Sequence, residues 1–248
     1  MRIRPILFNT DMVRAILDGR KTATRRAVKY KYSNTEMKMH TDKYGTHLIE
    51  IQKDIEGETH GKNPDGSTWH KLLPYIYKIP SYKKGDILYV RETWSKKRSS
   101  KCIGNKTEKC PYESCENAPG PCLYNEYIYK ATDNLESNDV TWHPSIHMPK
   151  EAARIWLKVL DVRVERLQDI KNVYNEGIHF CDCPAGYTWK DTTDMHNCYT
   201  DPVGAMKALW NSTIPKGQQD LYSWAANPWV WVIEFERCEK AEAAGEEG

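Results

Sequence analysis

The chain has 248 residues, of which 40% are hydrophobic and 28% are charged, and its formal net charge is +2. A chain this close to neutral has no overall charge typical of a nucleic-acid-binding protein, so any basic surface must be local. No apolar run of about 18 residues could span a membrane, and the apolar stretch after Met1 is too short for a signal peptide. We therefore expect a soluble, cytoplasmic protein.

Residues 5–18 predict a short strand followed by a helix. Asn9 or Thr10 can cap the helix, because a side-chain oxygen at this place accepts a hydrogen bond from a free backbone N–H. Gly19 follows as a left-handed helix stop. Residues 22–28, TATRRAV, then predict a strand.

The rest of the chain is richer in strands than in helices. The pattern predicts strands at 47–52, 87–91, 126–132, 153–167 and 228–238, and helices at 168–178 and 201–213. In the long strand, the apolar positions change face near Leu160 and Asp161, which indicates a bulge. In the last strand, one face carries Trp229, Trp231, Ile233 and Phe235.

The order of these elements predicts an α+β fold, because strands and helices do not alternate as in a parallel sheet. A small, partly open β-barrel with helices at its rim fits best. We expect a single domain over residues 1–238, followed by a disordered acidic tail over 239–248. Polar, turn-rich segments predict insertions at about 29–80, 96–124 and 179–202.

The second and third insertions contain cysteine clusters. Four cysteines within 21 residues have the spacing C-x7-C-x4-C-x6-C and could bind a tetrahedral zinc ion: Cys102, Cys110, Cys115 and Cys122. An iron–sulfur cluster, two local disulfides or free thiols are the alternatives. The third insertion holds a second potential metal-binding set: His179, Cys181, Cys183, His196 and Cys198. The two insertions could also share one site.

Two stretches could contact nucleic acid. DGRKTATRR, residues 18–26, contains Arg20, Lys21, Arg25 and Arg26, which could hold phosphates. TWHPSIHMP, residues 141–149, offers an aromatic ring for stacking and hydrogen-bonding groups for a base edge, from Trp142, Ser145 and His147. The alternatives are an ordinary half-exposed strand with β-forming threonines and a rigid loop that closes the barrel.

Several blocks of the sequence resemble the ASCH domain, a relative of the PUA RNA-binding barrel, and above all its larger phage and prophage members. They are ILDGRKTATRR, YKKGDILYVRETW, PSIHMPKEAARIWLKVLDVRVERLQDI, NEG and NPWVWVIEFER. The resemblance covers roughly residues 5–28, 75–95, 124–178 and 203–237. It implies a PUA-like barrel that recognises RNA or a modified nucleoside in a bacterial host cell.

The signature of the ASCH family is G-x-K-x-x-E-x-R. Gly19, Lys21 and Arg26 match it, whereas Thr24 stands at the place of the glutamate. The branch that hydrolyses N4-acetylcytidine is similar in carrying a threonine there. The resemblance to this branch implies a catalytic set of Lys21, Thr24 and, from the helix predicted after the long strand, Glu176.

This set has the groups that amide hydrolysis needs. Thr24 would be the nucleophile and requires a nearby base. Lys21 could be that base if burial lowers its pKa, and Glu176 could orient Lys21 or carry a proton to the leaving amine. Residues three apart in a regular strand face opposite sides, so Lys21 and Thr24 can converge only if the chain turns after Gly19. A ribonuclease that uses the same cleft, and a non-catalytic interaction module with a zinc-stabilised loop, are the alternative functions.

Overall fold

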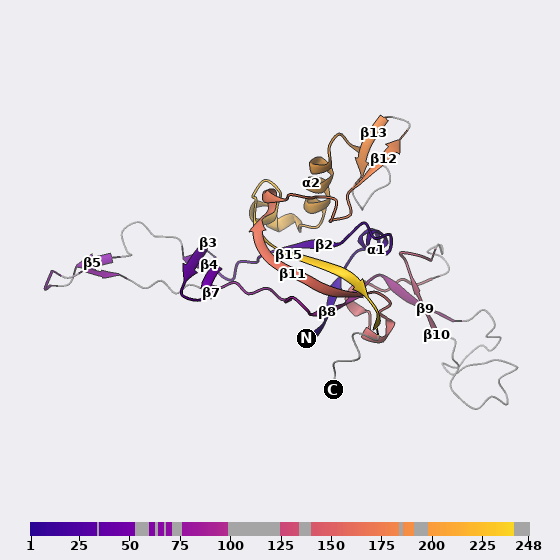
Figure 1. The fold of residues 1–248 in the computed structure, drawn as a ribbon, viewed down its shortest axis with the longest axis horizontal. Helices are drawn as coiled ribbons and strands as arrows, with labels where there is room; N and C mark the ends of the chain where they lie inside the picture. The colour runs from indigo at the N-terminus through magenta and orange to yellow at the C-terminus, as the bar shows by residue number, and fades with distance from the viewer. Residues whose placement is uncertain are drawn as a thin grey trace, which may run out of the picture.

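The structure is a computed structural model that describes residues 1–33, 35–52, 60–62, 64–66, 68–70, 76–98, 125–133, 140–183, 186–190 and 198–240. The fold is α+β, as predicted, with a mixed five-stranded central sheet (Figure 1). The strand order is β1 (Ile3–Leu7), β8 (Ile87–Arg91), β11 (Trp156–Arg166), β15 (Trp229–Cys238) and β2 (Ala23–Ala27). Only β1 and β8 pair in parallel.

Among the described strands, β1 and β2 are the two edges of this sheet, so the pairing is that of an open sheet, and the predicted small, partly open PUA-like barrel is not confirmed. The register of β11 against β15 shifts between Val159 and Asp161, which confirms the predicted bulge. A bulge bends its strand and increases the local twist. The sheet accordingly curves around the elements packed on it (Figure 1).

The N-terminal elements form as the sequence predicts. Helix α1 (Thr10–Leu17) follows β1, and the Asn9 side chain accepts a hydrogen bond from the backbone N–H of Met12. Gly19 has a φ of 73°, the left-handed conformation that lets the chain leave the helix. The apolar face of α1 covers one face of the sheet in a core that includes Ile6, Phe8, Val13, Ile16, Leu88, Leu157 and Ile233.

Helix α2 (Pro202–Ser212), capped by Asp201, packs on the other face of the sheet. This second core contains Leu167, Val173, Ile178, Met206, Leu209, Trp210, Val230 and Val232. Val230 and Val232 are both fully buried. Strand β15 is therefore covered on both faces, not only on the face of its aromatic residues. A short helix, α3 (Gln219–Tyr222), follows α2.

The predicted helix over 168–178 is wrong. A 3₁₀ turn forms at Leu167–Asp169 in place of the start of this helix. The chain then continues through turns to Gly177, whose φ is 95°. The Asn172 side chain accepts a hydrogen bond from the backbone N–H of Tyr174. Asparagine stabilises turns in this way, at the expense of a helix. As a result, Glu176 lies in a turn, where it pairs with the segment before β2.

The remaining strands lie in the predicted insertions or next to them. Residues 47–52 form a strand as predicted, within a hairpin. This outer sheet contains β3 (Thr35–Asp42), β4 (Gly45–Gln52) and β7 (Ile76–Tyr77). The other small sheets pair β5 (His60–Lys62) with β6 (Thr68–His70), β9 (Trp94–Arg98) with β10 (Asn125–Tyr129), and β13 (Gly186–Lys190) with both β12 (His179–Cys183) and β14 (Cys198–Tyr199). No helix of the described residues has the length and apolar character that crossing a membrane requires.

Candidate active site

The turn at Gly19 places Lys21 ahead of strand β2. The backbone N–H groups of Arg20 and Lys21 both donate to the carbonyl oxygen of Ala15, at 2.9 and 3.0 Å. Regular pairing of β2 begins only at Ala23, so the alternation of a strand does not apply between Lys21 and Thr24.

Backbone contacts join this turn to the segment that carries Glu176. Lys21 and Glu176 form an isolated antiparallel bridge. The N–H groups of Thr22 and Ala23 both donate to the carbonyl oxygen of Asn175, at 2.9 Å each. The position of Glu176 is therefore set by the backbone as well as by its side chain.

The Lys21 side chain is completely buried, and Nζ donates to two oxygens of Glu176. The distances are 2.6 Å to the carboxylate Oε2 and 3.1 Å to the backbone carbonyl. Burial lowers the pKa of Lys21, and the nearby Glu176 carboxylate opposes this change without cancelling it. A buried amine with a lowered pKa loses its proton more readily than an exposed lysine and can act as a base.

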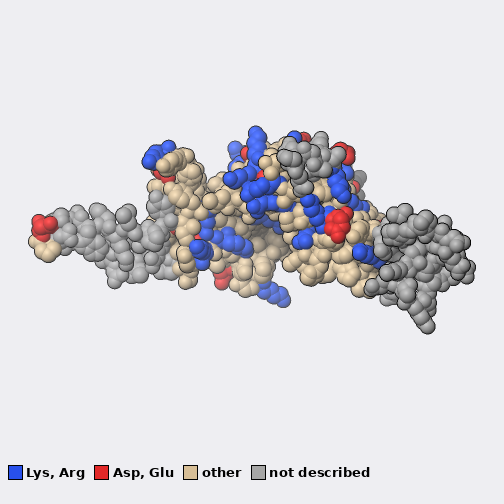
Figure 2. All heavy atoms as spheres, turned by 90° about the horizontal axis from the view of Figure 1, so that it is seen from below, with Lys and Arg blue, Asp and Glu red and all other residues tan. Residues whose placement is uncertain are grey.

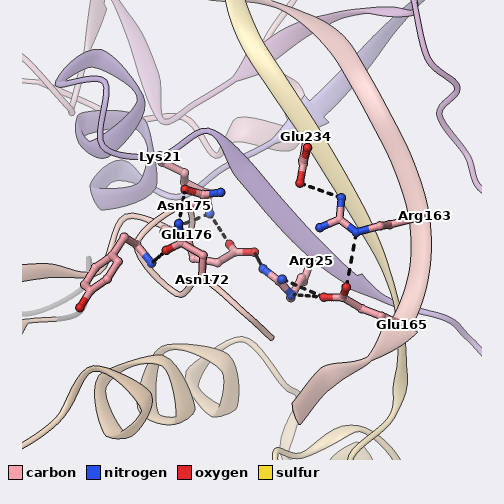
Figure 3. Close-up of polar contacts among 9 residues, drawn as sticks. Lys21, Arg25, Arg163, Glu165, Asn172, Asn175, Glu176 and Glu234 are labelled. Carbon is pink, nitrogen blue, oxygen red and sulfur yellow. Dashed lines mark hydrogen bonds and ion pairs between the residues drawn. The ribbon is translucent and has the colours of Figure 1, made fainter. Parts of the chain in front are cut away.

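Arg25 binds the other oxygen of the same carboxylate (Figure 3). Its Nη1 lies 2.9 Å from Glu176 Oε1, while Nε and Nη2 donate to Glu165 Oε1 at 3.2 and 2.8 Å. Arg163 continues the chain of contacts, with Nε 3.5 Å from Glu165 Oε2 and Nη1 2.7 Å from Glu234 Oε1. The Arg25 guanidinium thus orients Glu176 within the protein and is already engaged by two carboxylates.

Thr24 is buried in β2 opposite Ile233 and lines a cavity of about 220 Å³, the Thr24 cavity. Glu176 lines the same cavity, whereas Lys21 does not. Much of the polar lining comes from β2, and the apolar lining comes from α1, α2 and the residues just after α2, as Met12, Met206, Leu209, Trp210 and Ile214. Sequence reasoning identified α2 as a helix but missed it as a wall of the site, since only the fold brings it beside β2.

The other two predicted basic residues lie at the border of the site. Arg20 donates to Asp18 Oδ2 at 2.8 Å and to the carbonyl oxygen of Gly177 at 3.0 Å. Arg26 is exposed, lines the Thr24 cavity and donates from Nη2 to the carbonyl oxygen of Leu7 at 2.7 Å.

The second predicted ligand-binding stretch is not part of the Thr24 cavity. Trp142, Ser145 and His147 do not line it. They surround a 3₁₀ turn at Ser145–His147, after an isolated bridge in which His143 pairs with Trp94.

The predicted zinc ligands Cys102, Cys110, Cys115 and Cys122 lie outside the described residues, so the zinc site stays a prediction. Of the second set, His196 also lies outside them, and nothing is described of the side chains of Cys181, Cys183 and Cys198, so this metal site stays a prediction as well. Within the part of the chain that the structure describes, no group of three or more His, Cys, Asp or Glu residues could hold a metal ion. The described ring of His179 lies with Nδ1 3.4 Å from Arg20 Nη1.

Comparisons with protein-family models, curated proteins and solved structures found no match to this chain.

Proposed function

We propose that this protein is an ASCH-type, PUA-like RNA- or nucleoside-binding protein that hydrolyses the amide of an acylated cytidine in the Thr24 cavity. The observation that supports this most is the buried contact of 2.6 Å between Lys21 and Glu176, next to a cavity that Glu176 shares with Thr24. The bent strand β11 is compatible with a PUA-like barrel.

In the first step, the Thr24 hydroxyl oxygen attacks the carbonyl carbon of the acyl group. The proton of the hydroxyl passes to neutral Lys21 through the Glu176 carboxylate, because Glu176 is the member of the pair that lines the cavity. The C–N bond then breaks, and the same proton returns through Glu176 to the amine of the leaving cytidine. The acyl group stays on Thr24 as an ester.

In the second step, water attacks the ester carbonyl carbon, and the Lys21–Glu176 pair takes its proton. The bond between the acyl carbon and Thr24 Oγ1 breaks, Thr24 recovers its proton, and a carboxylic acid leaves. The sum of both steps is one amide and one water converted to one amine and one acid. Arg25 keeps the Glu176 carboxylate in place throughout, since it binds the oxygen that Lys21 does not use.

The walls of the cavity suit such a substrate. Trp210 and the aliphatic side chains of α2 provide apolar surface for a pyrimidine ring and a short acyl group. Arg26 and Lys29 line the same cavity, and the Arg26 guanidinium could contact the polar edge of the base or a phosphate.

The test is release of cytidine from N4-acetylcytidine by the full chain and its variants. Thr24→Val keeps the shape of the side chain but removes the hydroxyl, and should lower the rate about 100-fold or more, as should Lys21→Met. Thr24→Ser should keep much of the activity. Thr22→Val is the matched control, because Thr22 is exposed and does not line the cavity. Folded protein without turnover, or turnover that survives Thr24→Val, contradicts the proposal.

A further inference from the structure

Another cavity shares Arg26 with the Thr24 cavity. It has a volume of about 250 Å³, and its lining includes the aromatic residues Tyr82 and Trp231 and the apolar residues Ile6 and Ile233. We call it the aromatic pocket. Among the residues that the structure describes, no carboxylate lines it. Its aromatic and apolar lining, with Arg26 beside it, suits a planar ring that carries a negative charge nearby.

The two rings are held by different parts of the fold. The Tyr82 hydroxyl donates to the carbonyl oxygen of Pro5 at 2.9 Å, which fixes the ring beside β1. Trp231 belongs to β15, is partly exposed, and lies directly opposite Arg26 in the pairing of β15 with β2. Both residues line the same cavity, which is present in the structure without a bound ligand.

Arg26 joins the aromatic pocket to the Thr24 cavity, since it lines both. Within the described part of the chain its guanidinium donates one hydrogen bond, to Leu7, so its other N–H groups are available. An arginine has five N–H donors in a fixed plane, and phosphate is a preferred acceptor. If each cavity held one base, the phosphate that links the two nucleotides could bind to the Arg26 guanidinium.

The surroundings of the aromatic pocket are positively charged. Arg4 and Arg26 both act electrostatically on the Tyr82 hydroxyl, and exposed Lys83 and Lys84 follow Tyr82 in the chain. One face of the molecule, shown in Figure 2, carries many more Lys and Arg than Asp and Glu over its centre. Local positive charge of this kind favours a polyanion over a neutral nucleoside.

We infer that the aromatic pocket binds the base next to the acylated cytidine, so that the substrate is a single-stranded oligonucleotide and not a free nucleoside. This inference rests on the proposed function for the identity of the reacting base. The neighbouring base stacks between Tyr82 and Trp231, and Arg26 binds the phosphate that links the two nucleotides. Stacking on aromatic side chains accepts any base, so the pocket selects a polymer and not a sequence.

The first experiment measures binding and needs no turnover. A fluorescently labelled hexanucleotide of unmodified RNA is titrated with the full chain, and cytidine monophosphate and inorganic phosphate are added as competitors. Tyr82→Leu should weaken binding about tenfold, and Tyr82→Phe should retain more of the binding than Tyr82→Leu, because it keeps the ring and loses only the hydrogen bond to Pro5. Tyr44→Leu is the control, since Tyr44 is an exposed aromatic residue of the β3–β4 turn, outside the pocket.

The second experiment compares kcat/KM for N4-acetylcytidine as a nucleoside and within a trinucleotide. The wild type should prefer the trinucleotide about tenfold, and Tyr82→Leu should lose that preference. If no variant hydrolyses either compound, the proposed function fails, while the titration still decides on the pocket. Folded Tyr82→Leu that binds the hexanucleotide like the wild type overturns the inference, as does wild type that does not bind it, or binds it no better than the monophosphate or phosphate ion.

Discussion

Lys21 Nζ and Glu176 Oε2 lie 2.6 Å apart although 155 positions separate the two residues in the sequence. Backbone contacts also hold the two segments together. Lys21 and Glu176 form a β-bridge, and the N–H groups of Thr22 and Ala23 donate hydrogen bonds to Asn175. Lys21 is completely buried, so the pair is sheltered from solvent. A sheltered pair held by backbone contacts can transfer protons in a fixed geometry, which is what catalysis requires.

The pH dependence of hydrolysis should reveal the buried lysine. In the proposed mechanism neutral Lys21 is the base, so kcat/KM should rise with pH as Lys21 loses its proton and then level off. Burial lowers the pKa of Lys21 from the ordinary 10.5, so the midpoint of this rise should lie below that value. Measuring kcat/KM between about pH 6 and pH 10 reports the pKa of the free enzyme. A rate that falls over this range contradicts a role for Lys21 as base.

Loss of Arg25 should destabilise the protein more than loss of any other arginine of the same network. Arg25 is buried and binds both Glu165 and Glu176, so Arg25→Met leaves two carboxylates short of a partner. Breaking a buried ion pair costs about 3–5 kcal/mol of unfolding free energy. Arg25→Lys should recover only part of it, because one ammonium group does not replace the planar fork. Urea unfolding followed by tryptophan fluorescence measures the difference.

Arg163→Met is the matched control for Arg25→Met. Arg163 contacts Glu165 and Glu234 on the same face of the sheet, but 42% of its side chain is exposed. Exposed ion pairs contribute about 0–1 kcal/mol. If both variants lose the same unfolding free energy, the buried ion pairs of Arg25 stabilise the fold no more than exposed ones do, which contradicts its role in supporting Glu176.

The local features of this fold were predictable from the sequence, whereas the contacts of the site were not. The Asn9 cap, the left-handed Gly19 and the bulge in β11 depend on residues close together in the chain. The spacing of Ile170, Val173 and Ile178 resembles that of a helix, and all three do pack in the core beneath α2. Turn formation at Asn172 overrides that spacing. No local pattern indicates that Arg25 joins Glu165 to Glu176.

Gly19→Ala should destabilise the turn that presents Lys21. An added Cβ would meet no atom within 4 Å, so there is no steric clash. The cost comes from the φ of 73°, which disfavours any residue with a side chain by about 1–2 kcal/mol. Gly19→Asn should cost less, since asparagine tolerates this conformation. Thermal unfolding of both variants measures the effect. If Gly19→Ala is as stable as the wild type, the turn does not require a left-handed residue.

Glu50 should make the outer hairpin sensitive to acid. Its side chain is almost completely buried near the C-terminal end of β4. Burial alone would raise its pKa, but an ion pair with Lys78 and hydrogen bonds from Thr35 and from the backbone of Tyr32 and Lys31 outweigh it. The pKa falls from the ordinary 4.5 to about 2. This carboxylate therefore ties the segment before β3 and the segment after β7 to one point.

A carboxylate whose pKa is lower in the folded state stabilises that state above its unfolded pKa. The contribution of Glu50 should be complete above about pH 4.5 and should disappear as the pH falls toward about 2. A pKa lowered from 4.5 to about 2 corresponds to about 3 kcal/mol. Urea unfolding of the wild type and Glu50→Gln at several pH values should therefore show a difference that shrinks in acid. Glu36→Gln is the control, because Glu36 lies on the neighbouring strand with its side chain 37% exposed. A difference between wild type and Glu50→Gln that stays constant with pH would mean that the Glu50 charge does not stabilise the fold, and that only its shape does.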